Sequence, residues 1–162
     1  MGKKLFLSFI SLSLIFFGCT NGGNKISSLN YFTDNGAVSP PYYYESSLIF
    51  VPDYELRTLE VSYSVVYPFR TEETESIDVD TEGIIGGNYF DRFEKIVNLF
   101  ESGKFDDLKE EDIVGAGGFD VILEKEGSSV EKYSFRGVTE NKNFKTVKSF
   151  HDDVVALFSE DL

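Results

Sequence analysis

The sequence predicts an α+β domain, with an antiparallel sheet of about four or five strands and two amphipathic helices packed on one face. Three observations lead to this prediction. Several segments alternate apolar and polar residues, two segments repeat apolar residues at helical spacing, and tight turns separate the alternating segments. Strands that follow one another through tight turns pair in antiparallel fashion, and helices then cover the apolar side of the sheet.

The first half of the chain carries three strand patterns. Residues 42–51 are rich in aromatic and β-branched side chains, and the pair 52–53 is typical of a turn. From Leu59 to Phe69 apolar and polar residues alternate, as they do again in residues 77–82, where Gly83 is expected to end the strand. The last two segments are predicted to form a hairpin.

The second half contains two helices and a second hairpin. Asn88 is expected to cap a helix that ends at Gly103, and a single helical turn is expected at 105–108. Residues 119–124 alternate, with Asp120 and Glu124 on the polar side, and 126–129 are typical of a turn. On the returning strand Tyr133 and Phe135 share one face, and Lys132 lies on the opposite, polar face. A final helix is expected to be capped near Asn143. The two apolar helix faces consist of Phe90, Phe93, Ile96, Val97 and Phe100, and of Val147, Phe150, Val154, Leu157 and Phe158.

The N-terminus has the pattern of an export signal. Lys3 and Lys4 precede an apolar and hydroxyl run over residues 5–17, and Gly18 and Cys19 follow it. About thirteen helical residues reach roughly 20 Å, which is short of the roughly 30 Å hydrocarbon core of a bilayer. The run is therefore interpreted as a signal rather than as a membrane span.

Phe16-Phe17-Gly18-Cys19 resembles the lipobox of bacterial lipoproteins. The resemblance implies that Cys19 is acylated, becomes the new N-terminus and holds the protein to a lipid bilayer. Phe16 and Phe17 stand where that motif more often has Leu, Val or Ile and then a small residue. The alternative is an ordinary cleaved signal that leaves a free thiol. The remainder resembles small lipoprotein domains of unknown role, and no functional residue is carried over from that likeness.

These patterns divide the chain into three parts. Residues 1–18 are the expected cleaved signal, and residues 19–41 are the expected lipidated cysteine and flexible tether, with Gly22, Gly23 and the Pro40-Pro41 pair as linker residues. Residues 42–162 are expected to form a single globular domain.

Composition limits the partners. The chain has 28 Asp and Glu residues against 15 Lys and Arg residues, which gives a formal charge of −13. Such a surface repels nucleic acid, so a nucleic-acid partner is not expected. With one cysteine no disulfide within the chain is possible.

Two acidic segments are candidate chemical sites. Asp78, Asp80 and Glu82 match the first half of a calcium loop, but position twelve of that loop is Tyr89 instead of glutamate, so a solvated strand face is favoured. The acidic cluster Asp106, Asp107, Glu110, Glu111 and Asp112 is interpreted as a solvated face. The sole histidine, His151, is expected at the surface. We expect no metal, no cofactor and no catalytic residue.

Tyr42, Tyr43 and Tyr44 are the candidate binding surface, because exposed tyrosines supply rigid contact area. The alternative is an edge strand whose alternate tyrosines pack inward. The expected function is a noncatalytic binding or structural module of the bacterial cell envelope, which contacts another envelope protein or a cell-wall polymer. Periplasmic and surface exposure both stay open. The alternative from another class is a small envelope hydrolase using paired carboxylates.

Overall fold

A computed structural model of the chain describes residues 25–34, 43–67, 79–109, 118–127, 129–136 and 141–159. The strands are β1 Ile26–Asp34, β2 Glu45–Asp53, β3 Thr58–Val66, β4 Val79–Gly86, β5 Phe119–Lys125 and β6 Val130–Ser134. The helices are α1 Asn88–Glu101 and α2 Lys142–Ser159, with a 3-10 turn, η2, at Asp106–Leu108.

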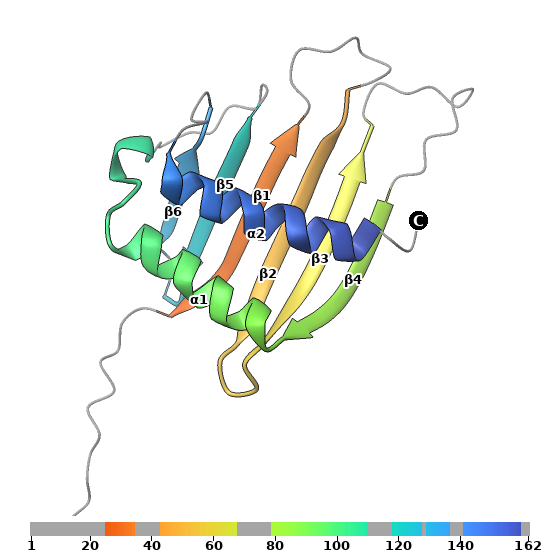
Figure 1. Cartoon of the computed structure of the whole chain (residues 1–162), viewed down its shortest axis with the longest axis horizontal. Coiled ribbons are helices and arrows are strands. Elements are labelled where there is room, and N and C mark those ends of the chain that lie inside the picture. Colours follow the sequence, from red (N-terminus) through yellow and green to blue (C-terminus); the bar gives the residue numbers. More distant parts are fainter. Residues whose placement is uncertain are drawn as a thin grey trace, which may run out of the picture.

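All described strands belong to one sheet, in the order β4-β3-β2-β1-β5-β6, and every neighbouring pair is antiparallel (Figure 1). The predicted combination of helices with an antiparallel sheet is therefore confirmed. The prediction of four or five strands is wrong, because the sheet has six.

The additional strand is β1, which lies in the middle of the sheet. It covers residues 26–34, which were expected to belong to the tether, and it pairs with both β2 and β5. Leu29 and Tyr31 are completely buried there. The register shifts between Ile26 and Ser28, so a bulge interrupts the alternation that would have marked a strand. Residues 19–24 and 35–41 of the expected tether lie outside the described part.

The β2–β3 hairpin turns later than predicted. Pro52 still pairs with Leu59 in the ladder, and the turn occupies residues 54–57. The carboxylate of Asp53 accepts the backbone N–H groups of Glu55 and Leu56, each at 2.9 Å, which closes the turn.

The predicted hairpin of β3 and β4 is confirmed, but β4 continues past Gly83 to Gly86. A Cβ atom added at Gly83 would lie 2.8 Å from Cε1 of Phe158. The glycine therefore permits α2 to pack closely on β4, and it does not end the strand.

Both predicted helices are present, but their N-caps differ from those predicted at Asn88 and near Asn143. Gly87, with φ of 59°, stands at the N-cap of α1, which makes no side-chain cap bond. At α2 the side-chain oxygen of Asn141 accepts the N–H groups of Asn143 at 2.8 Å and of Phe144 at 3.2 Å. Asn141 is therefore the cap of α2, two residues before the predicted position.

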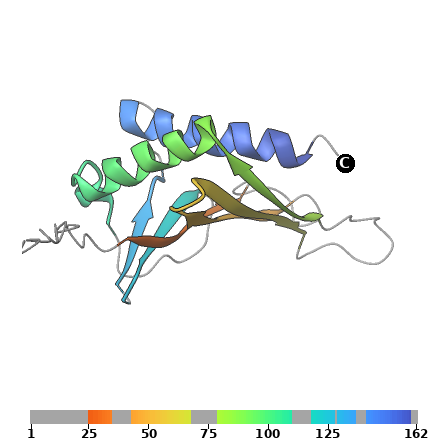
Figure 2. The same ribbon diagram turned by 90° about the horizontal axis from the view of Figure 1, so that it is seen from below.

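The core lies between the sheet and the two helices. Figure 2 shows α1 and α2 on the same side of the sheet. The ring of Phe50 on β2 lies 6.4 Å from that of Phe93 on α1 and 5.1 Å from that of Phe150 on α2. An ion pair of 2.6 Å between Arg92 and Asp153 joins the helices. Aromatic packing therefore fixes both helices over the middle strands.

The other side of the sheet, here called the outer face, is covered by neither helix. It is formed by the residues that alternate with the core positions, among them Asn30, Phe32, Ser62 and Ile122. The hydroxyl groups of Ser47 and Ser64 hydrogen bond across it at 2.8 Å. Among the described residues, no helix has both the length and the apolar character needed to cross a membrane.

Candidate functional site

The end of the sheet at which β1 finishes and β2 begins has a cavity on each face. Tyr43 and Tyr44 directly precede β2, and consecutive residues of an extended chain point to opposite faces. Tyr43 accordingly lines the cavity on the outer face, and Tyr44 lines the one beneath α2. The predicted tyrosine surface is thus divided between two faces, and Tyr42 lies outside the described residues.

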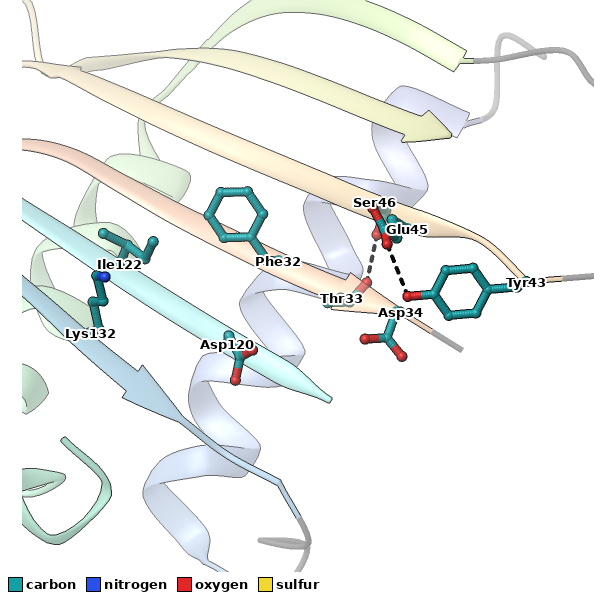
Figure 3. Close-up of a pocket in the computed structure, with 9 residues that line it drawn as sticks. All are labelled: Phe32, Thr33, Asp34, Tyr43, Glu45, Ser46, Asp120, Ile122 and Lys132. Carbon is teal, nitrogen blue, oxygen red and sulfur yellow. Dashed lines mark hydrogen bonds between the residues drawn. The ribbon is translucent and has the colours of Figure 1, made fainter. Parts of the chain in front are cut away.

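The cavity on the outer face, here called the outer pocket, has a volume of about 310 Å³ (Figure 3). Its wall combines two large apolar side chains with three carboxylates and one ammonium group. Four strands or their ends contribute to it. The lining residues are Phe32, Thr33 and Asp34 from β1, Tyr43 with Glu45 and Ser46 at the start of β2, Asp120 and Ile122 from β5, and Lys132 from β6.

Two hydrogen bonds hold the rim of the outer pocket, and Figure 3 shows both. The hydroxyl of Tyr43 donates to a carboxylate oxygen of Glu45 at 3.0 Å. The hydroxyls of Thr33 and Ser46 lie 2.5 Å apart and join β1 to β2. The first bond holds the hydroxyl of Tyr43 at the start of β2, and the second ties the ends of the two strands together.

Asp120 is the unusual residue of the outer pocket. Its exposed fraction is only 7%, although aspartate is rarely buried unless it is paired. One carboxylate oxygen, Oδ2, lies 3.5 Å from Nη2 of Arg136. The other, Oδ1, is buried and has no hydrogen-bond partner among the described residues. A buried carboxylate oxygen without a donor is costly, and Asp120 lines the outer pocket, so a small shift of this side chain toward the pocket would let a ligand or water add the missing hydrogen bond.

The second cavity lies between the sheet and α2 and has a volume of about 460 Å³. Tyr44, Tyr63 and Tyr67 form its aromatic wall, and the Tyr44 and Tyr67 ring centroids lie 6.0 Å apart. The polar side is formed by His151 and Asp152.

The prediction that His151 lies at the surface is wrong, because only 8% of the residue is exposed. Its ring packs against Tyr31 and Phe119, with centroids at 5.5 and 5.0 Å, and Nδ1 lies 3.0 Å from Oδ1 of Asp152. Burial lowers the pKa of His151, and the hydrogen bond with Asp152 opposes this in part.

The carboxyl groups with shifted pKa values are unsuited to act as general acids. Burial alone would raise the pKa of Glu131, but hydrogen bonds from Tyr133, Lys109 and Lys125 outweigh it and lower the pKa to about 2. Burial is likewise outweighed at Asp152, whose pKa is lowered by Lys148 and His151. A general acid needs a raised pKa, so these two groups do not support the hydrolase alternative.

The other predicted candidates are not brought together. Asp80 and Glu82 are exposed on β4, where an extended strand cannot wrap an ion as a calcium loop does, and Asp78 lies outside the described residues. The described ranges contain no group of three or more His, Cys, Asp or Glu side chains suited to a metal ion. Asp106 and Asp107 are exposed on η2, whereas residues 110–112 and Cys19 are not described.

Sequence reasoning missed most of the outer pocket. The alternating pattern correctly predicts Asp120 and Lys132 on the polar side of a hairpin. It does not predict which other strand pairs with that hairpin. Only β1 brings them beside Phe32 and Asp34, because β1 pairs with β5. The pocket could have been predicted only if residues 26–34 had been recognised as a strand.

Comparison with protein-family models, with curated proteins and with solved structures found no match for this chain.

Proposed function

We propose that the protein is a noncatalytic binding module of the bacterial cell envelope, held to a membrane by lipid on Cys19, whose ligand occupies the outer pocket. The single observation that carries the binding role is the buried Oδ1 of Asp120, which lacks a donor at the wall of that pocket. The partner is a segment of another envelope protein, and a cell-wall polymer is the alternative that the experiment below distinguishes.

The strand β1 separates the outer pocket from the proposed anchor. The chain enters β1 at Ile26, and the pocket lies at its other end, near Asp34. β1 has nine residues, and a strand rises about 3.3 Å per residue, so its first and last residues lie about 26 Å apart. This arrangement supports a ligand that approaches from the side of the domain away from the membrane.

The anchor itself is short in this proposal. Because β1 begins at Ile26, only residues 20–25 separate Cys19 from the sheet. Six extended residues reach about 20 Å, so the domain would be held close to the headgroups. The net charge of −13 opposes adhesion of the domain to an anionic lipid surface.

A pull-down in which the outer pocket is blocked tests the proposed function. The variant Phe32→Lys places a long cationic side chain beside Asp120 and fills the pocket, and Phe32 is 40% exposed, so the fold should tolerate the change. Leu56→Lys makes the same substitution at a residue that is 73% exposed in the β2–β3 turn, far from the pocket.

The tagged full-length protein would be recovered from cells after chemical cross-linking. We expect the same envelope protein with the unmodified chain and with Leu56→Lys, and its loss with Phe32→Lys. A wall fragment recovered in the same variant-dependent way would assign the polymer instead. Equal recovery of every species with both variants would contradict binding in the outer pocket.

A further inference from the structure

We propose that the outer pocket selects a cationic group carried on an apolar body, such as the side chain of a lysine or arginine in the partner protein. The inference rests on the proposed function and names the chemistry of its ligand. It is carried by a buried acidic atom without a donor, by the charges around it and by the apolar wall beside it.

The buried carboxylate of Asp120 is incompletely hydrogen bonded. Arg136 approaches only Oδ2, at 3.5 Å, which is long for a charge-assisted hydrogen bond. Oδ1 has no donor among the described residues, and the hydroxyl of Ser134, which pairs with Asp120 across the β5–β6 ladder, is also buried without a partner. Because the carboxylate accepts hydrogen bonds and donates none, the group that completes it must be a donor, and a cationic donor is favoured most.

The charges around Asp120 favour the same sign of ligand. Among the described residues, Asp34 and Glu45 also line the outer pocket, Lys132 supplies the ammonium group of its wall, and the guanidinium of Arg136 lies 3.5 Å from Asp120. Carboxylates therefore outnumber cations in the wall, and the whole chain has a net charge of −13. Both the local and the long-range field attract a cation.

The apolar part of the pocket wall favours a ligand that carries apolar groups as well as a positive charge. Phe32 is 40% exposed, and it lies with Ile122 and the ring of Tyr43 in the same cavity as Asp120. A volume of about 310 Å³ is at the lower end for ligand pockets, which suits one long side chain better than a polymer. Methylene groups would cover Phe32 and Ile122, and a cation can also lie over the aromatic faces.

Three probes with a common phenylethyl or phenylpropyl body and different charge test the inference. 2-Phenylethylammonium is cationic, 2-phenylethanol is neutral, and 3-phenylpropionate is anionic. Each would be titrated into the full-length protein in a neutral detergent. The measurements are the dissociation constant and the chemical-shift changes of the backbone amides of Phe32, Tyr43 and Asp120.

Two variants remove one negative charge each from the same face of the same strand. Asp120→Asn removes the proposed partner, and Glu124→Gln is the matched control, because Glu124 is an exposed residue of β5 that does not line the outer pocket. We expect 2-phenylethylammonium to bind about tenfold more tightly than 2-phenylethanol, and Asp120→Asn to abolish that preference. Glu124→Gln should leave it unchanged to within about twofold.

The outcomes separate this inference from the proposed function. If the alcohol or the carboxylate binds as tightly as the ammonium and shifts the same amides, the pocket remains a binding site but the cationic class is wrong. The cationic class is also wrong if Asp120→Asn binds 2-phenylethylammonium with an unchanged dissociation constant. If no probe shifts the pocket amides at millimolar concentration, the inference is overturned, whereas the pull-down still decides the proposed function. The probe comparison in the unmodified chain stands even if Asp120→Asn fails to fold.

Discussion

The buried imidazole of His151 links the stability of the core to pH. It is held between Tyr31 and Phe119, and burial lowers its pKa below the ordinary 6.5. The unfolded chain therefore binds a proton at a higher pH than the folded chain does. Stability from this group is fully present above pH 6.5 and is lost as the pH falls below that value toward the lowered pKa.

We expect the free energy of unfolding to decrease as the pH falls from 6.5 toward 5, and His151→Gln to remove most of that decrease. Denaturant unfolding at several pH values measures it. His151 is the only histidine of the chain. The carboxyl groups of Glu131 and Asp152 have lowered pKa values, so their protonation changes the free energy of unfolding only below about pH 4.5. An equal slope in the variant between pH 6.5 and 5 would show that another group is responsible.

Two phenylalanines on neighbouring strands should differ sharply in their effect on stability. Phe50 is completely buried and contacts rings from both helices, whereas Phe32 is 40% exposed on the outer face. Phe50→Ala should lower the free energy of unfolding by about 3–5 kcal/mol because it leaves a cavity. Phe32→Ala should cost about 1 kcal/mol or less. Similar losses in chemical denaturation would contradict the assignment of Phe32 to a ligand surface.

At the scale of the element, β1 decides whether the sheet forms. It provides the ladder partner of both β2 and β5 and contributes Leu29 and Tyr31 to the core. A chain that begins at Lys25 should unfold cooperatively. A chain that begins at Asn35 should lack a cooperative transition in circular dichroism, because the sheet would be cut into two parts. Folding of the shorter chain would restore the interpretation of residues 26–34 as a tether.

The same strand shows what the sequence could and could not predict. Regular alternation located β3 and the β5–β6 hairpin, and helical spacing located α1 and α2, because these signals are local. β1 lacks a regular alternation because its bulge near Ile26 shifts the register and because the outward Phe32 is as apolar as the buried Tyr31 beside it. The cap at Asn141 and the close approach over Gly83 depend on packing that no local pattern records.

The outer pocket was out of reach for a related reason. Its members are dispersed over β1, β2, β5 and β6, and the order of the strands alone brings them together. Tyr43 was identified from the tyrosine run, whereas Asp120 was seen only as a polar residue of a hairpin. The unpaired Oδ1 is a property of the folded environment and has no counterpart in the sequence.

At the scale of the whole molecule, the proposed lipid on Cys19 would determine where the domain is found. Two or more acyl chains hold a protein stably to a bilayer, and one holds it only marginally. We expect the unmodified protein in the membrane fraction and Cys19→Ala in the soluble or secreted fraction. Metabolic labelling with an alkyne fatty acid should mark the former alone. Identical labelling and fractionation of both chains would contradict the anchor.

Photo-cross-linking in living cells tests most directly whether the outer pocket is the binding site. A photoreactive amino acid would replace Phe32 in one strain and Leu56, the more exposed residue of the β2–β3 turn, in another. If the ligand occupies the outer pocket, we expect a discrete cross-linked product from position 32, its loss when Asp120→Asn is added, and none from position 56. Products from position 56 alone, or from both positions alike, would contradict binding there.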